Sequence, residues 1–155
     1  MKATRLLCSQ HRHVETLLAR VAGERELRLT LMLQLVEELM THLSIEEHVF
    51  LCHLADATGI RADSYSEDQG QVRNAVLQAV FAEENDALFA TRLDELSAAF
   101  ERHAHLMERD VFPIADAQLK GDDLETMGVR MQTHWNAAMH GDGLPGHAHH
   151  EAAAQ

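Results

Sequence analysis

The chain has 155 residues, enough for one domain with a sizeable hydrophobic core. Its formal net charge of −12 argues against a nucleic-acid partner, which needs a basic face, and against an anionic membrane surface. Only two prolines and eight glycines interrupt a composition rich in Leu, Ala, Glu and Arg, which favours an all-α protein. Twelve histidines are the compositional outlier, and neutral imidazole is a frequent metal ligand.

The first half of the chain predicts two long helices. Apolar residues recur with helical spacing over residues 4–22 and again over 24–57. Gly23 and Gly59 follow these two runs, and glycine commonly ends a helix. Polar residues stand within the apolar rows of the second helix, so we expect them to face the interior.

The second half predicts a third and a fourth helix. Ser64 and Glu67 form a capping-box pattern that opens the third. Asn85 or Asp86 can cap the fourth. Pro113 should bend this fourth helix, because proline lacks an amide donor and crowds the preceding turn.

Gly121 is expected to end the fourth helix, and Asp122 and Asp123 can start a fifth. The gaps between the helices are short, which favours antiparallel neighbours. Residues 1–140 therefore predict an all-α fold, an up-down antiparallel four-helix bundle with a short C-terminal fifth helix. Residues 141–155 contain helix breakers and several histidines, and we expect a flexible tail.

The sequence also predicts a cytoplasmic protein. No apolar run is long enough to span a membrane, and the first ten residues lack the apolar segment of a secretory signal. The cysteines, Cys8 and Cys52, are far apart and form no metal-binding or redox motif, so we expect reduced thiols.

A pattern of histidine and glutamate occurs twice in the predicted helices. The first copy has His11 in the first helix, and His42 followed by Glu46 in the second. His42 and Glu46 lie one turn apart on the same helix face, so both can reach one ion. A carboxylate in an apolar row is costly unless it is paired. The two residues therefore either form a salt bridge alone or contribute to a metal site.

The second copy keeps one of the three residues. His103 matches His42, but Gln69 stands where the first copy has His11, and Met107 stands where it has Glu46. Doubled helix pairs with inward His and Glu form two-metal carboxylate sites in helical bundles. Gln69 offers at most a weak oxygen ligand, so we expect the second metal position to be weaker than the first.

The doubled pattern resembles a hemerythrin-like domain. The resemblance covers about residues 5–119, and it lies in the early histidine, the His-x-x-x-Glu-Glu string ending near an aromatic residue, and the second such pair. It implies a four-helix bundle with a non-haem di-iron centre, used for oxygen binding, oxygen or redox sensing, iron handling, or peroxide and nitric-oxide chemistry.

The resemblance also implies a ligand set. It gives three terminal histidines and one bridging carboxylate: His11, His42, His103 and Glu46. The second bridging carboxylate falls at Met107, which cannot serve. Glu108 satisfies an alternative His-x-x-x-x-acid spacing, although five residues place it about 140° around the helix from His103.

We therefore expect a protein with one or two non-haem iron ions per chain. It binds or senses O2, with NO or peroxide as the alternative ligands, through an asymmetric or partly degenerate di-iron site. The first copy alone has the two histidines and one carboxylate of a mononuclear non-haem iron(II) site. Three alternatives stay open. They are a metal-free structural or regulatory bundle, a di-iron enzyme that removes peroxide or nitric oxide, and haem held by a histidine and Met107.

Overall fold

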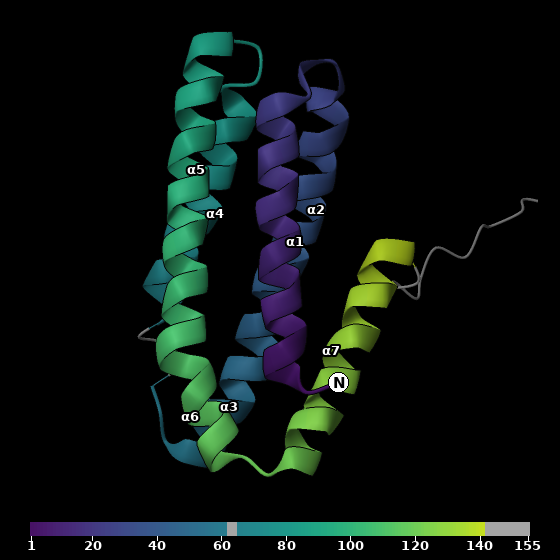
Figure 1. The fold of residues 1–155 in the computed structure, drawn as a ribbon, viewed down its shortest axis with the longest axis vertical. Coiled ribbons are helices and arrows are strands. Elements are labelled where there is room, and N and C mark those ends of the chain that lie inside the picture. The colour runs from purple at the N-terminus through teal and green to yellow at the C-terminus, as the bar shows by residue number, and fades with distance from the viewer. Residues whose placement is uncertain (62–64, 142–155) are drawn as a thin grey trace, which may run out of the picture.

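The computed structural model describes residues 1–61 and 65–141, and every regular element in them is helical (Figure 1). The helices form an antiparallel bundle, which confirms the fold predicted from the sequence. Within these described ranges, none of the helices is long and apolar enough to cross a membrane.

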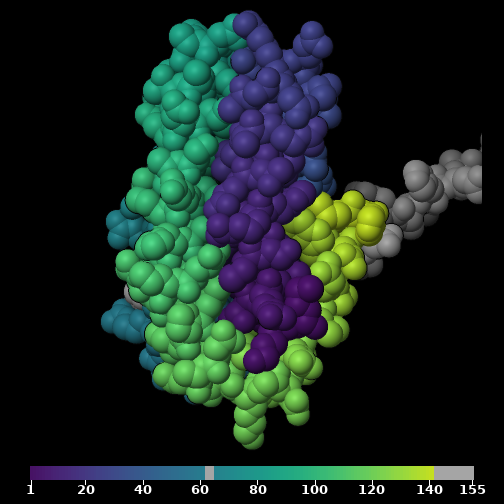
Figure 2. All heavy atoms as spheres, viewed as in Figure 1, coloured from purple at the N-terminus to yellow at the C-terminus, as the bar shows by residue number. Residues whose placement is uncertain are grey.

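Two antiparallel helix pairs build the bundle. The four helices are α1 (Ala3–Gly23), α2 (Arg28–Ile45), α4 (Ser66–Phe81) and α5 (Asp86–Leu106). α1 pairs with α2 and α4 pairs with α5, while α1 also contacts α5 and α2 contacts α4. In the space-filling view, α1 lies beside α5 along its length, with α7 on its other side in the lower part of the picture and α2 in the upper part (Figure 2).

α2 and α5 each continue through a π-helical turn into a short helix. Glu46–Leu51 joins α2 to α3 (Cys52–Thr58), and Met107–Val111 joins α5 to α6 (Phe112–Gln118). Pro113 lies in the first turn of α6, where its missing amide donor is tolerated. The helix in which a bend was predicted at Pro113 thus contains a π-helical turn that ends at Val111, just before this proline. Such turns occur frequently at functional sites.

Several predicted helix ends are confirmed. α1 ends at Gly23, and Gly59 follows α3 in the left-handed conformation with φ 75°. The side chain of Asn85 caps α5 by accepting a hydrogen bond from the amide of Leu88 at 3.0 Å.

We expected Gly121 to end the fourth helix. Instead, Gly121 begins α7 (Gly121–His140). The chain leaves α6 at Leu119, because Leu119 and Lys120 both adopt extended backbone, with ψ 146° and 151°. α7 corresponds to the fifth helix predicted from the sequence. It is 20 residues long and packs on α1 and α2. The predicted cap at Ser64 and most of the predicted tail lie outside the described residues.

Two apolar clusters fill the bundle, one at each end. One cluster lies near the α1–α2 and α4–α5 turns, and on α1 it begins at Val14. The other lies beside α7, and on α1 it ends at Leu7. Along α5 and the π-helical turn that follows it, the first cluster ends at Ala104 and the second begins at Met107. The boundary between the two clusters therefore lies near the middle of the bundle, at the level of His11.

Candidate metal centre

Four fully buried polar side chains meet at this boundary. His11 comes from α1, His42 from α2 and His103 from α5, while Glu46 begins the π-helical turn after α2. All four have 0% exposure, and one potential ligand atom from each lies within 4.8 Å of the others. Two donors about 2.1 Å from one ion can lie at most about 4.2 Å apart, so the cluster is close to the size that one ion requires.

The helix geometry explains why these residues converge. His42 and Glu46 are four residues apart on a continuous helix, so both leave the same face. The same spacing on α5 runs from His103 to Met107, which also begins a π-helical turn. The Met107 side chain is 1% exposed and packs in the apolar cluster beside α7. The repeat seen in the sequence is therefore also a repeat in the structure, with an apolar residue in place of the second carboxylate.

The outward-facing nitrogen of each histidine is hydrogen-bonded to an oxygen. The Nδ1 atoms lie 2.8, 3.0 and 2.7 Å from their acceptors: Glu108 Oε1 for His11, Gln10 Oε1 for His42 and Asp68 Oδ2 for His103. Carboxylate and amide oxygens can only accept, so each Nδ1 carries a proton and donates it. In a neutral ring, this leaves the Nε2 lone pair free. Histidines that bind metals are usually held in this way.

The inward-facing atoms contact one another: His103 Nε2 lies 3.1 Å from Glu46 Oε2, and His11 Nε2 lies 3.7 Å from Glu46 Oε1. The Nε2 atoms of His11, His42 and His103 and the Oε1 atom of Glu46 are buried and form no hydrogen bond within the described residues. An unsatisfied buried polar atom costs about 1–3 kcal/mol, and native proteins contain few of them. Four such atoms that face one another fit a cation, which would satisfy all of them.

The charges of the metal-free cluster are set by burial and by mutual contacts. Burial lowers the pKa of His42 to about 3, so this ring is neutral at neutral pH. Burial opposes ionisation of Glu46, but the neighbouring histidines outweigh it and hold its pKa well below the usual range. Burial likewise opposes protonation of His103, but the Glu46 charge and the hydrogen bond to Asp68 raise its pKa to about 9. The metal-free centre therefore holds a proton on His103, whose Nε2 lies 3.1 Å from Glu46 Oε2.

Aromatic side chains surround the cluster and restrict the rings. Phe112 stacks on His11 with centroids 5.8 Å apart and an interplanar angle of 13°. Phe100 contacts all three histidine rings, at centroid distances of 5.8, 6.2 and 5.8 Å for His11, His42 and His103. This apolar shell excludes water and strengthens electrostatic interactions within the site.

Glu108, predicted as a ligand of the second position, is not brought into the cluster. Its side chain is 31% exposed and accepts hydrogen bonds from His11 Nδ1 and from Arg12. It therefore contacts the outer edge of the His11 ring, away from Nε2. The wide angle between Glu108 and His103 on the helix is the physical reason for this difference.

Sequence reasoning missed Gln10 and Asp68, the partners of His42 and His103. A signal for them was present in the repeat. Gln10 precedes His11 by one residue, and Asp68 precedes the matching Gln69 by one residue. The two hydrogen-bond partners thus occupy equivalent positions in the two copies and hold equivalent histidines.

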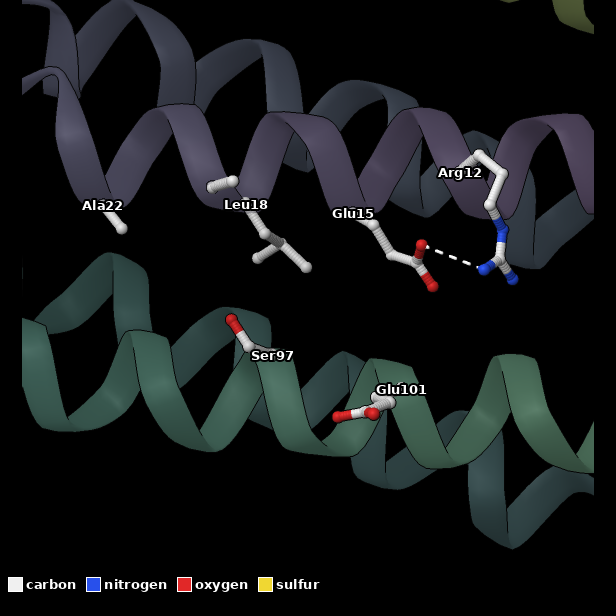
Figure 3. Close-up of a pocket in the computed structure, with 7 residues that line it drawn as sticks. Arg12, Glu15, Leu18, Ala22, Ser97 and Glu101 are labelled. Carbon is white, nitrogen blue, oxygen red and sulfur yellow. Dashed lines mark ion pairs between the residues drawn. The ribbon is translucent and has the colours of Figure 1, made fainter.

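A cavity of about 440 Å³ lies at the surface between α1 and α5 (Figure 3). It is lined by Arg12, Glu15, Leu18, Ala19, Ala22, Ser97 and Glu101. None of the four buried cluster residues lines it. Arg12 connects it to the cluster, because Arg12 also contacts Glu108, which holds His11.

The family model of the hemerythrin HHE cation-binding domain matches residues 2–115, well over half of the chain. The chain belongs to the hemerythrin family. The matched hemerythrin domain includes all four cluster residues and ends within α6, so α7 follows it. No curated protein and no solved structure matches the chain. The family description and the inward-facing donor atoms agree on a cation-binding centre.

Proposed function

We propose that this hemerythrin-family protein binds non-haem iron through His11, His42, His103 and Glu46, and that the iron binds a small ligand such as O2. The observation that carries the proposal is the set of four buried donor atoms that face one another and form no hydrogen bond within the described residues. Imidazole and carboxylate ligands together suit non-haem iron. The bound iron would supply ligand binding and redox exchange.

The residues of the chain prepare this site in three ways. The outer hydrogen bonds fix each histidine ring with its Nε2 atom inward. Glu46 supplies one negative charge that partly balances a cation. Phe100 and Phe112 keep water from the rings.

The complete burial of the site favours a diatomic or similarly small ligand. All four cluster residues are fully buried, and Arg12 and Glu108 stand between the cavity at the α1–α5 surface and His11. A large organic substrate placed in that cavity would not reach the cluster. We therefore propose oxygen binding or redox sensing, with NO and peroxide as other small ligands.

We also propose a cytoplasmic location for this function. Cys8 and Cys52 are both free thiols. Free thiols are usual in a reducing compartment, where iron(II) is also stable toward oxidation.

The test is reconstitution of metal-free protein with iron(II) under anaerobic conditions, followed by desalting, metal analysis and absorption spectra before and after exposure to air. We expect retained iron and a spectrum that changes with air, and His42→Ala as a control should retain little iron. Absence of retained metal would support the metal-free bundle instead. A Soret band in protein from cells would indicate haem, and rapid peroxide consumption would indicate an enzyme.

A further inference from the structure

Gln69 occupies the position that the repeat assigns to a histidine, and it makes a different set of contacts. It is 1% exposed, and its Nε2 atom donates to Glu46 Oε2 at 2.8 Å. On the other side, Arg73 Nη2 lies 3.4 Å from Gln69 Oε1 and 2.6 Å from Glu47 Oε2. These contacts form a chain from half-buried Glu47 through Arg73 and Gln69 to the buried carboxylate of Glu46.

Donor and acceptor chemistry fixes the orientation of the Gln69 amide. The guanidinium of Arg73 can only donate, so it must face the amide oxygen. The ionised carboxylate of Glu46 can only accept, so it must face the amide NH2 group. The opposite orientation would place two donors together at Arg73 and two acceptors together at Glu46. The amide oxygen, which is the side-chain atom of Gln69 able to bind a cation, is therefore directed to Arg73.

This orientation leaves Glu46 with one free oxygen. Oε2 accepts the hydrogen bond from Gln69, while Oε1 is buried and forms no hydrogen bond within the described residues. In the bridging mode in which each carboxylate oxygen binds one ion, a second ion would compete with Gln69 for Oε2. The contact with Gln69 thus leaves Oε1 for an ion that the three Nε2 atoms also reach.

The surroundings offer few donors for a second ion. Metal pairs in proteins lie about 3.5–4 Å apart, so a second ion needs its own ligands. Met107 presents a thioether where a second carboxylate would stand, and thioethers suit soft metals. Asp68 and Glu108 are directed to the outer nitrogens of His103 and His11. Within the described residues, the group of possible metal ligands consists of His11, His42, Glu46 and His103.

We propose that Arg73 is a positioning residue that, through Gln69, holds Glu46 as a one-oxygen ligand and so restricts the buried centre to a single metal ion. This inference rests on the proposed metal-binding function. A single-ion centre differs from the di-iron centre implied by the family resemblance. Gln69 and Met107, the two departures from the repeat in the second copy, would then both act against a second ion.

The first test is the number of ions per chain. Metal-free wild-type protein is titrated anaerobically with iron(II), desalted and analysed for iron. One ion per chain supports the proposal, and an isolated ferric ion after oxidation should give an electron paramagnetic resonance signal. Two ions per chain would overturn the inference and leave the proposed function intact. Absence of bound iron would overturn the proposed function itself, and the two failures are therefore distinguishable.

The second test asks whether Arg73 acts through Gln69. The dissociation constant for iron(II) is measured by competition with a chelator for Gln69→Leu, Arg73→Met and the double variant. We expect Gln69→Leu to weaken binding about 10- to 100-fold, as is usual when a hydrogen-bond partner of a metal ligand is removed. Arg73→Met alone should weaken iron binding. When Gln69→Leu is already present, adding Arg73→Met should have no further effect, because the effects of substitutions at interacting residues do not add.

Arg92→Met is the matched control, since Arg92 is half-buried like Arg73 and pairs with Glu95 at 2.7 Å. It should leave the dissociation constant unchanged within about twofold. Arg73→Lys keeps a donor and should restore part of the affinity lost in Arg73→Met. Additive effects of Gln69→Leu and Arg73→Met, or equal effects of Arg73→Met and Arg92→Met, would overturn the role of Arg73. If Gln69→Leu does not fold, the iron count and the comparison of the arginine variants still decide.

Discussion

The carboxylate of Glu108 accepts a hydrogen bond from Nδ1 of His11 at 2.8 Å, which joins a partly exposed side chain to the buried centre. Arg12 holds the same carboxylate from the solvent side. Contacts to His11 and Arg12 outweigh the effect of partial burial and lower the pKa of Glu108, so it stays ionised and acceptor-only near neutral pH. Glu108 therefore acts on the metal centre by orienting His11, although it is not brought into the cluster.

Glu108→Ala should weaken iron binding about 10- to 100-fold, because His11 loses the acceptor that fixes its tautomer and ring orientation. Glu108→Gln keeps an oxygen acceptor and should lose less. Chelator competition measures both. Glu101→Ala, which removes another acidic side chain from the same surface, is the control and should bind iron like the wild type. Wild-type affinity in Glu108→Ala would refute the orienting role.

Metal binding should release close to one proton per chain at pH 7.5. His103 carries a proton in the metal-free protein, because the Glu46 charge and the Asp68 hydrogen bond outweigh burial and raise its pKa to about 9. His42 releases none, since its pKa of about 3 leaves it neutral already. A ligating imidazole must give up its proton to the solvent. Titration calorimetry in two buffers of different ionisation enthalpy measures the release, and a value near zero would contradict this assignment.

The metal-free protein should be most stable near pH 6.5. His103 has a folded pKa of about 9, above the unfolded value of 6.5, so its contribution to the free energy of unfolding is present below pH 6.5 and is lost as the pH rises through 9. His42 has a folded pKa of about 3, below its unfolded value of 6.5. As the pH drops below 6.5, His42 is protonated in the unfolded chain but not in the folded protein, so the free energy of unfolding falls. Chemical denaturation of metal-free protein between pH 5 and pH 9 tests this.

A His103→Gln variant provides the control for this profile. It should lose much of the decline between pH 6.5 and 9 while keeping the decline on the acid side, which belongs to His42 and Glu46. An unchanged alkaline decline in this variant would show that another group causes it.

Removal of metal should lower the thermal midpoint of unfolding by about 5–10 °C. An ion that binds only the folded state at a hundredfold excess over its dissociation constant stabilises that state by about 2.7 kcal/mol. For a domain of this size, 1 kcal/mol shifts the midpoint by about 2–4 °C. Melting curves of iron-loaded protein with and without chelator provide the measurement. His42→Ala should melt at the same temperature with and without chelator, and a wild-type midpoint indifferent to chelator would favour the metal-free bundle.

The sequence predicts the helices from their apolar periodicity, and helical spacing places His42 and Glu46 on one inward face. The convergence of these two residues with His11 and His103 was implied by the repeat and by the family resemblance. The sequence does not predict that Asp68 holds His103 or that Arg73 contacts Gln69. Those contacts cross between helices or depend on side-chain rotamers, and a difference of one residue in register would change them. The position of Glu108 was missed for a related reason. Spacing to His103 on its own helix suggested a ligand, whereas the structure places it against His11 of another helix.

Gln69→His combined with Met107→Glu should raise the iron content toward two ions per chain. These changes restore the second copy of the pattern to the chemistry of the first, with an imidazole and a carboxylate in place of an amide and a thioether. In the wild type, the outer nitrogen of His11 donates to Glu108, which follows His103 by five residues. The equivalent residue in the first copy is Glu47, which follows His42 by five residues. The histidine introduced at position 69 therefore needs Glu47 as the acceptor for its outer nitrogen. Arg73 holds Glu47 at 2.6 Å in the wild type. Adding Arg73→Met should therefore bring the iron content closer to two.

Gln69→His with Met107→Gln is the matched control for that conversion, because it introduces the imidazole and a polar side chain of similar size without the second carboxylate. It should stay near one ion per chain, since a neutral amide binds iron weakly. Metal analysis after desalting gives the count, and loss of the ferric resonance signal would indicate two coupled ions. If the Gln69→His, Met107→Glu, Arg73→Met variant folds but still holds one ion, Gln69, Met107 and Arg73 do not set the metal number. The backbone of the second copy would then limit the centre to one ion, since α4 and α5 would hold the new ligands too far from Glu46 to share it.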